Sequence, residues 1–111
     1  MDLNLLLKDV YASVKQIYGD ELVKVILYGS YARGDYHEYS DIDILALVKC
    51  DDKTIQELRN KLLSAIGDLN WKHSVYISIS VMINNIDYFN YWKDTMPYFK
   101  NVVKDGIEIS V

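Results

Sequence analysis

Two short apolar runs lie on either side of a polar, glycine-containing loop, and they constrain the possible fold of this chain more than any other feature. The first run, Leu22–Tyr28, reads LVKVILY and lies between Gly19 and Gly29. The second run, Asp41–Val48, reads DIDILALV. Short runs that are rich in branched apolar residues and bounded by turn residues are typical of buried strands. The sequence therefore predicts a sheet that other elements cover.

Two longer segments have the periodicity of helices. Apolar side chains recur at steps of three and four residues through Asp2–Tyr18 and again through Lys53–Leu69. Such spacing places the apolar side chains in one stripe along a helix, which then packs on a core. Gly19 is a suitable stop for the first helix, and Asp51 and Asp52 precede and cap the second.

The remainder of the chain predicts a third strand and several short elements. In Val75–Ile83 apolar and serine residues alternate, so Ile77, Ile79 and Val81 point to one side and Ser78 and Ser80 to the other. The later segments are a helix, then a turn or helix, then a short edge strand: Ile86–Trp92, Pro97–Val103 and Gly106–Ile109. The order α-β-β-α-β-α predicts an α/β (α+β) fold with a mixed sheet and packed helices.

Length and composition narrow the class of protein. A chain of 111 residues is expected to form a single domain over residues 1–111. No run approaches the ~20 apolar residues of a membrane span, and the first residues do not resemble a signal peptide. The lone Cys50 indicates a reducing cytoplasm, and a net charge of −4 disfavours direct binding of nucleic acid. We expect a cytoplasmic protein without membrane contact.

The loop between the first two predicted strands contains candidate ligand-binding residues. It reads GSYARGD from Gly29 to Asp35. Gly29 lets the backbone turn sharply after the strand and approach a ligand. Ser30 lies where a short helix begins, and its hydroxyl and the local N–H groups suit phosphate oxygens. Arg33, one turn later, can reach the same negative charge.

Two carboxylates follow this loop. Asp41 and Asp43 are two residues apart on a strand, so both project from one face. Adjacent carboxylates repel, and a divalent cation between them relieves the repulsion. Oxygen ligands favour Mg²⁺, which is commonly held by one or two carboxylates and substrate phosphates. Each motif alone is common in turns and solvated edges, but together they predict a site for metal-assisted phosphoryl or nucleotidyl transfer.

These residues resemble a known signature. Gly29-Ser30-x-x-Arg33-Gly34 followed by Ser40-Asp41-x-Asp43 is similar to that of the DNA polymerase β-like nucleotidyltransferase superfamily, and the short chain resembles its minimal nucleotidyltransferases, the MNT antitoxins. The resemblance implies a nucleotidyltransferase fold, with ATP as substrate and Mg²⁺ as cofactor. It also implies transfer of AMP to a tyrosine of a HEPN-family RNase toxin, which is thereby neutralised. Gly29, Ser30 and Arg33 would bind the nucleotide, and Asp41 and Asp43 would be the catalytic metal ligands.

One departure from the family pattern bears on activity. The family places a third acidic residue on the later strand, and Ser78, or alternatively Ser80, occupies that position here. Asp35 or Glu38 of the loop is a candidate replacement. Two other functions stay open: a degenerate domain that neutralises the toxin by binding alone, and a small-molecule nucleotidyltransferase. A homo-oligomer also stays open.

The remaining candidates have simpler interpretations. His37 and His73 are expected at the surface, and Cys50 is expected to be structural. The aromatic segment Tyr88–Trp92 has helical spacing, which favours packing over stacking on a base or binding a partner.

Overall fold

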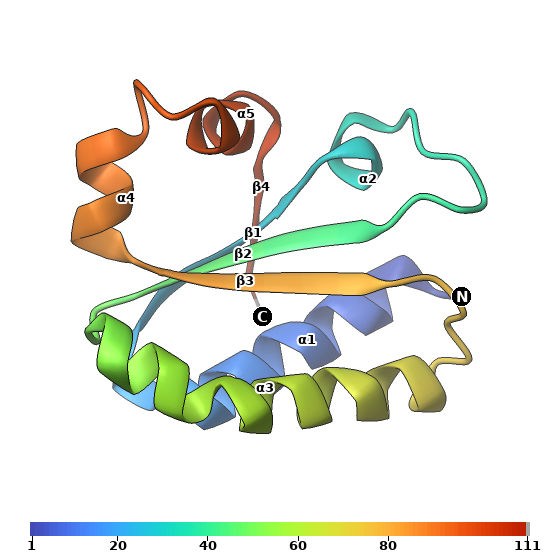
Figure 1. Ribbon diagram of the computed structural model, residues 1–111. Coiled ribbons are helices and arrows are strands. Elements are labelled where there is room, and N and C mark those ends of the chain that lie inside the picture. The colour runs from blue at the N-terminus through green and yellow to red at the C-terminus, as the bar shows by residue number, and fades with distance from the viewer. Residues whose placement is uncertain (111) are drawn as a thin grey trace.

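The computed structural model describes residues 1–110, which form a four-stranded sheet with helices on both faces (Figure 1). The strands are β1 (Leu22–Tyr28), β2 (Ile42–Val48), β3 (Ile79–Asn85) and β4 (Ile107–Ile109). The helices are α1 (Leu3–Tyr18), the short 3-10 turn η1 (Gly19–Glu21), α2 (Ser30–Arg33), α3 (Asp52–Lys72), α4 (Ile86–Trp92) and α5 (Pro97–Asp105). The mixed α/β fold predicted from the sequence is confirmed.

The sheet has the order β3-β2-β1-β4. β1 runs antiparallel to β2 and to β4, whereas β2 runs parallel to β3. α1 and α3 cover the face drawn below the sheet in Figure 1, which we call the lower face. α2, α4 and α5 lie on the other side, which we call the upper face.

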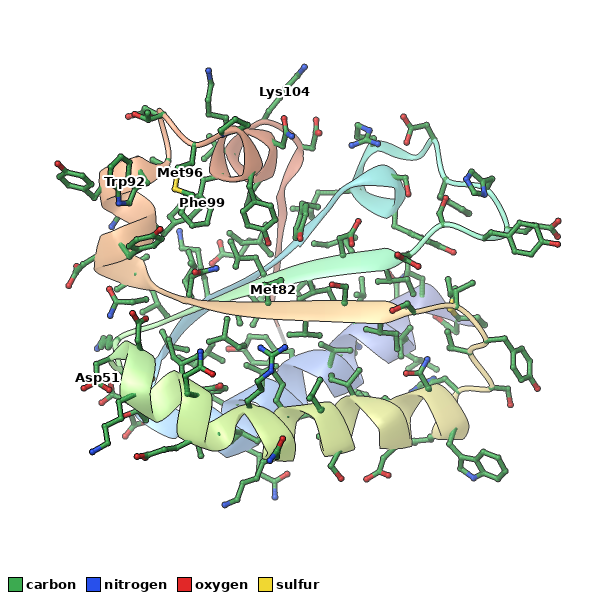
Figure 2. All side chains as sticks on the ribbon, in the orientation of Figure 1. Asp51, Met82, Trp92, Met96, Phe99 and Lys104 are labelled. Atoms are coloured by element: carbon green, nitrogen blue, oxygen red, sulfur yellow. The ribbon has the colours of Figure 1, made fainter. Side chains whose placement is uncertain are left out.

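The lower face holds the larger core. Asp2 caps α1 and Asp51 caps α3 through their side-chain oxygens, and both long helices begin within one residue of their predicted starts. α3 extends to Lys72, beyond its predicted end at Leu69. Their apolar stripes meet alternate residues of the strands. The fully buried members of this core include Leu6, Val10, Val14, Val25, Ile42 and Ile44. Figure 2 shows that side chains fill the space between the sheet and the two helices.

The upper face has a second, smaller core. It joins the β2 side chains Leu45 and Leu47 to Phe89 of α4 and to Phe99 and Val102 of α5. The rings of Phe89 and Phe99 meet edge to face, with centroids 5.0 Å apart. The predicted packing role of Tyr88–Trp92 therefore holds for Phe89, whereas Tyr91 is 76% exposed.

The third strand starts later than the sequence predicts. β3 covers Ile79–Asn85 instead of Val75–Ile83. The Asn70 side chain donates hydrogen bonds to the carbonyls of Val75 and Ile77, at 3.3 and 3.1 Å, and so holds this segment against the end of α3. The alternation itself is confirmed, because Ile77, Ile79 and Val81 pack on the lower core.

The prediction for one histidine is wrong. The His73 side chain is only 12% exposed, because its Nε2 lies 2.7 Å from Asp9 Oδ2. Lys72 Nζ lies 3.1 Å from the same oxygen, so the cluster joins α1 to the end of α3. His37 is exposed, as predicted. No helix within residues 1–110 has both the length and the apolar character needed to cross a membrane.

Candidate active site

The candidate site lies where β1 ends and β2 begins, on the upper face. Gly29 follows β1 with φ 77° and ψ −157°, a conformation that a residue with a side chain rarely adopts. A Cβ at this position would lie 2.5 Å from Asp43 Oδ2. Glycine is thus required both for the turn and for the close approach of the Asp43 carboxylate to the backbone.

The loop after Gly29 forms a single helical turn. Ser30 is the first residue of α2, as the sequence predicts. The Gly29 carbonyl accepts the N–H groups of Ala32 and Arg33, each at 3.1 Å. Gly34, at φ 85°, ends the turn and donates its N–H to the Ser30 carbonyl at 2.9 Å. The turn therefore places Ser30 directly after the glycine that contacts Asp43.

Asp43 occupies the centre of the site. It lies beside Tyr28 of β1 and beside Ser80 of β3 in the sheet register. Burial raises the pKa of Asp43, the negative charge of Asp41 raises it further, and Arg33 lowers it in part. Asp41 is exposed and immediately precedes β2. A partly buried carboxylate whose pKa is raised by the charge of a neighbouring carboxylate belongs to a donor set that a hard divalent cation fits.

The third acidic position has no carboxylate. The register places Ser80 directly beside Asp43, whereas Ser78 precedes β3 and its carbonyl accepts the Ile42 N–H at 3.0 Å. Ser80, the alternative in the sequence prediction, is therefore the residue that neighbours Asp43 across the strands. Nowhere in the described chain do three or more His, Cys, Asp or Glu side chains gather in a metal-binding group.

Arg33 is engaged by two carboxylates. Its Nε lies 3.1 Å from Asp35 Oδ2, and its Nη1 lies 3.2 Å from Asp105 Oδ2 at the end of α5. Asp35, one of the candidate replacements for the third carboxylate, is thus paired with Arg33. The arginine fastens the α2 turn to α5 through its Nε and Nη1 atoms, and these contacts use only part of the donor capacity of the guanidinium.

Sequence reasoning missed two tyrosines beside the site. The hydroxyls of Tyr28 and Tyr98 lie 2.8 Å apart, and their rings meet edge to face. Burial is the main cause that raises the pKa of each tyrosine, and the nearby negative charge of Asp43 adds to it. Both hydroxyls therefore stay protonated at neutral pH. The strand register places Tyr28 beside Asp43, and no local pattern in the sequence places Tyr98 there.

Comparison with curated proteins gives relatives along most of the chain. A protein of Methanocaldococcus jannaschii, whose name gives protein adenylyltransferase as a provisional activity, is 34% identical over 90% of this chain and 90% of its own length. A second protein of that organism, with the same provisional activity in its name, is 38% identical over 70% of this chain and 77% of its own length.

Solved structures share the fold. A structure described provisionally as a minimal nucleotidyltransferase matches with a TM-score of 0.59 at 24% identity, over 98% of this chain and 97% of that chain. A structure of a toxin–antitoxin with AMP-PNP matches with a TM-score of 0.51 at 23% identity, over 92% of this chain and 70% of that chain.

The family comparison covers nearly the whole molecule. The model of the nucleotidyltransferase domain matches residues 7–109, a span that runs from α1 to β4 and includes the complete Gly29–Asp43 region. The relatives and the shared fold agree with this match. The chain belongs to the nucleotidyltransferase domain family, the enzyme family that its glycine-serine turn and paired aspartates resemble.

Proposed function

We propose that this protein is an antitoxin that transfers AMP from ATP to a tyrosine hydroxyl of a HEPN-family RNase toxin and thereby neutralises it. The observation that carries the catalytic part is the contact between the Asp43 carboxylate and the Gly29 turn. A triphosphate on that turn and a cation on Asp41 and Asp43 would meet within one small site.

The chain's own residues have distinct roles in this proposal. Gly29 and Ser30 hold the triphosphate, Asp41 and Asp43 hold Mg²⁺, and Arg33 contacts a phosphate through its guanidinium group. The bound Mg²⁺ supplies charge stabilisation on the phosphate oxygens. The acceptor oxygen forms a bond to the α-phosphorus, the bond from that phosphorus to the β-phosphate oxygen breaks, and pyrophosphate leaves. The hydroxyl proton passes to solvent or to a base of the acceptor protein.

The relatives support the choice of acceptor and partner. Two proteins that are 34% and 38% identical to this chain carry protein adenylyltransferase in their names, which favours a protein acceptor over a small molecule. The fold shared with a toxin–antitoxin that was solved with AMP-PNP is compatible with an ATP-derived substrate and a toxin partner.

The test uses the product of the neighbouring gene as acceptor. Incubation with this protein, ATP and Mg²⁺ is expected to add the mass of AMP to one tyrosine of that product and to abolish its RNase activity. The Asp41→Asn/Asp43→Asn double variant is the control for catalysis. A partner that is neutralised without any gain in mass would contradict transfer.

A second candidate function rests on the serine beside Asp43. Without a third carboxylate the site lacks an obvious general base, and such help is worth roughly 10²–10⁴-fold in rate. The domain would then bind nucleotide and neutralise the toxin by occlusion. Ser80→Asp and Ser78→Asp distinguish AMP transfer from neutralisation by occlusion. A clear gain of AMP transfer in either variant would support the view that the serine weakens catalysis in the present site.

A further inference from the structure

β3 forms an open edge of the sheet. It is an outer strand, and no helix or loop of residues 1–110 passes in front of it in Figure 1. Its seven residues, ISVMINN, include no charge and no proline. Monomeric proteins commonly protect an edge with charges, proline or a very short strand. The opposite edge follows that rule, because β4 has only three residues and carries Glu108 at its centre.

The backbone of β3 has a defined outward side. The Ser78 carbonyl accepts the Ile42 N–H, so this residue directs its backbone groups toward β2. Successive residues of a strand direct these groups to opposite sides. Ile79, Val81 and Ile83 therefore direct their N–H and C=O groups away from β2, to the open edge. Only another extended polypeptide supplies donors and acceptors at that spacing.

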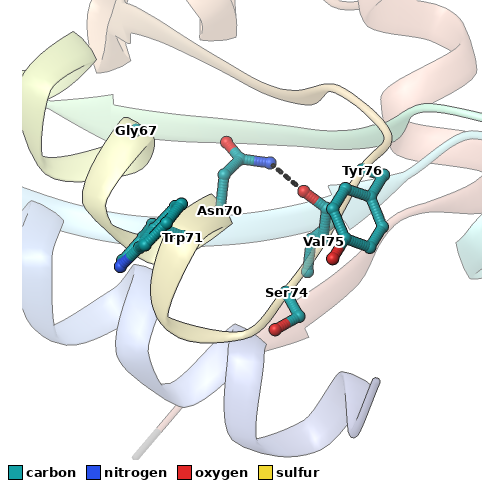
Figure 3. A pocket seen from close by; sticks show the side chains of 6 residues that line it. All are labelled: Gly67, Asn70, Trp71, Ser74, Val75 and Tyr76. Carbon is teal, nitrogen blue, oxygen red and sulfur yellow. Dashed lines mark hydrogen bonds between the residues drawn. The ribbon is translucent and has the colours of Figure 1, made fainter.

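Two hollows lie along the same edge. One, of about 160 Å³, lies between α3 and β3 and is lined by residues that include Arg59, Leu63 and Met82. The other, of about 510 Å³, lies at the segment that leads into β3 (Figure 3). Trp71 and Tyr76 line it and are 88% and 94% exposed. Hollows beside an open strand are suited to side chains of an added strand.

The register connects this edge to the candidate active site. Asp43 neighbours Ser80, so a strand added outside β3 would place one of its residues next to Ser80. With strands about 4.8 Å apart, that residue lies on the order of 10 Å from Asp43 along the sheet. A tyrosine is long enough to extend across a serine toward Asp43, whereas a bulky residue at position 80 would obstruct it.

We propose that the outer edge of β3 binds an extended segment of the acceptor protein as a fifth strand and presents its acceptor tyrosine across Ser80 to Asp43. The choice of an acceptor segment and the presentation of its tyrosine rest on the proposed function, whereas the capacity of the β3 edge to pair with a strand does not. The occupant is an acceptor segment rather than a second copy of this chain, because the register brings the added strand to the catalytic carboxylates.

Amide hydrogen exchange tests the docking without ATP. In the protein alone, the amides of Ile79, Val81 and Ile83 are expected to exchange fast, and those of Ser80, Met82 and Asn84 slowly. The probe is a soluble peptide, KTVYVTK, whose matched control KTPYPTK has proline, which is poorly tolerated in a paired strand, in place of both valines. The first peptide is expected to slow exchange at the three outward amides, and the second is not.

Variants at one position separate docking from folding. Val81→Pro removes an outward N–H, whereas Val81→Ala shortens the same side chain and keeps the N–H. The proline variant is expected to lose peptide protection and at least tenfold in AMP transfer to the partner, with unchanged ATP binding as the measure of an intact fold. The alanine variant is expected to retain both the peptide protection and the AMP transfer.

The outcomes distinguish the two proposals. Normal transfer to the partner by Val81→Pro, or no protection by KTVYVTK, would overturn docking at β3. Outward amides that are already protected in a dimer of the protein alone would assign the edge to a second copy and would also overturn it. Protection without any AMP transfer would leave the docking in place and contradict the proposed function.

Discussion

The same strands contribute residues to both faces of the sheet, but the residues on the two faces have different roles. On β2, Ile42 and Ile44 point into the lower core, while Asp43 and Leu45 lie on the alternate, upper side. Two long helices cover the lower face, whereas three shorter ones lie on the upper face (Figure 1). The upper face is therefore apolar only where α4 and α5 cover it, and it carries a partly exposed carboxylate where β2 begins.

This difference separates stability from chemistry. Side chains of the lower core are buried, and Tyr31 and Ala32 of α2 pack against them. The candidate site instead contains a carboxylate that folding has partly desolvated, which costs stability and makes the site a better cation ligand. Changes on the lower face should therefore affect unfolding, and changes in the site should affect the reaction.

The largest effect is expected from removal of both site carboxylates. Asp41→Asn/Asp43→Asn should lower AMP transfer roughly a thousandfold, because metal-ion charge stabilisation is worth several kcal/mol. The free energy of unfolding should not fall, since two repelling carboxylates are lost. Mass spectrometry of the partner and urea unfolding measure the two quantities, and a marked loss of stability would show that the faces are not separable.

Truncation of a buried side chain on the lower face should lower stability without changing ATP binding. Leu6 is fully buried between α1 and the sheet. Leu6→Ala should lower the free energy of unfolding by about 2–5 kcal/mol through lost burial and a residual cavity. ATP affinity, measured by calorimetry under conditions where the variant is folded, should not change. A large loss of affinity in the folded variant would link the lower core to the site.

Gly29→Ala is expected to lower stability and to weaken ATP binding at the same time. The added Cβ would clash with Asp43 Oδ2, and the φ of 77° is costly for alanine. We expect a loss of about 1–2 kcal/mol in stability from the backbone conformation. ATP binding should weaken in addition, because either the turn or the carboxylate must move. Gly34→Ala, at φ 85° with no atom near its Cβ, is the control that shares the backbone strain alone.

The smallest effect is a contrast in pH dependence. Hydrogen bonds from His73 and Lys72 lower the pKa of Asp9, so its stabilising contribution is present above the unfolded-state pKa and declines as pH falls through the folded value. Burial and the charge of Asp41 raise the pKa of Asp43, so folding there favours the protonated form and stability declines as pH rises through the raised value.

Thermal unfolding between about pH 3 and pH 6 measures this contrast, a range around the ordinary carboxyl pKa. Relative to the parent protein, Asp9→Asn should lose the most thermal stability at the upper end of this pH range. Asp43→Asn should gain the most thermal stability at that same end. Parallel curves for the two variants would contradict the opposite shifts of the two carboxyl groups.

The prediction for β3 shows where sequence reasoning reached its limit. Alternation correctly assigned the sides of Ile77 and Ile79, but the strand was placed too early. The start was decided by two features outside the alternation. Asn70 binds the carbonyls that precede β3, and β2 offers paired residues only from Ile42 onward. A strand begins where a partner strand begins, and the sequence of that strand does not contain this information.

The sequence alone determined the two long helices, the glycine turn and the spacing of Asp41 and Asp43, because each depends on residues within a few positions of one another. Tertiary structure decided which side chains surround that motif. Tyr98 reaches Tyr28 across 70 positions, Arg33 pairs with Asp105 across 72, and Ser80 neighbours Asp43 through strand pairing. These contacts arise from the packing of α5 and β3 on the sheet, since local periodicity specifies which face a residue occupies but not its neighbour.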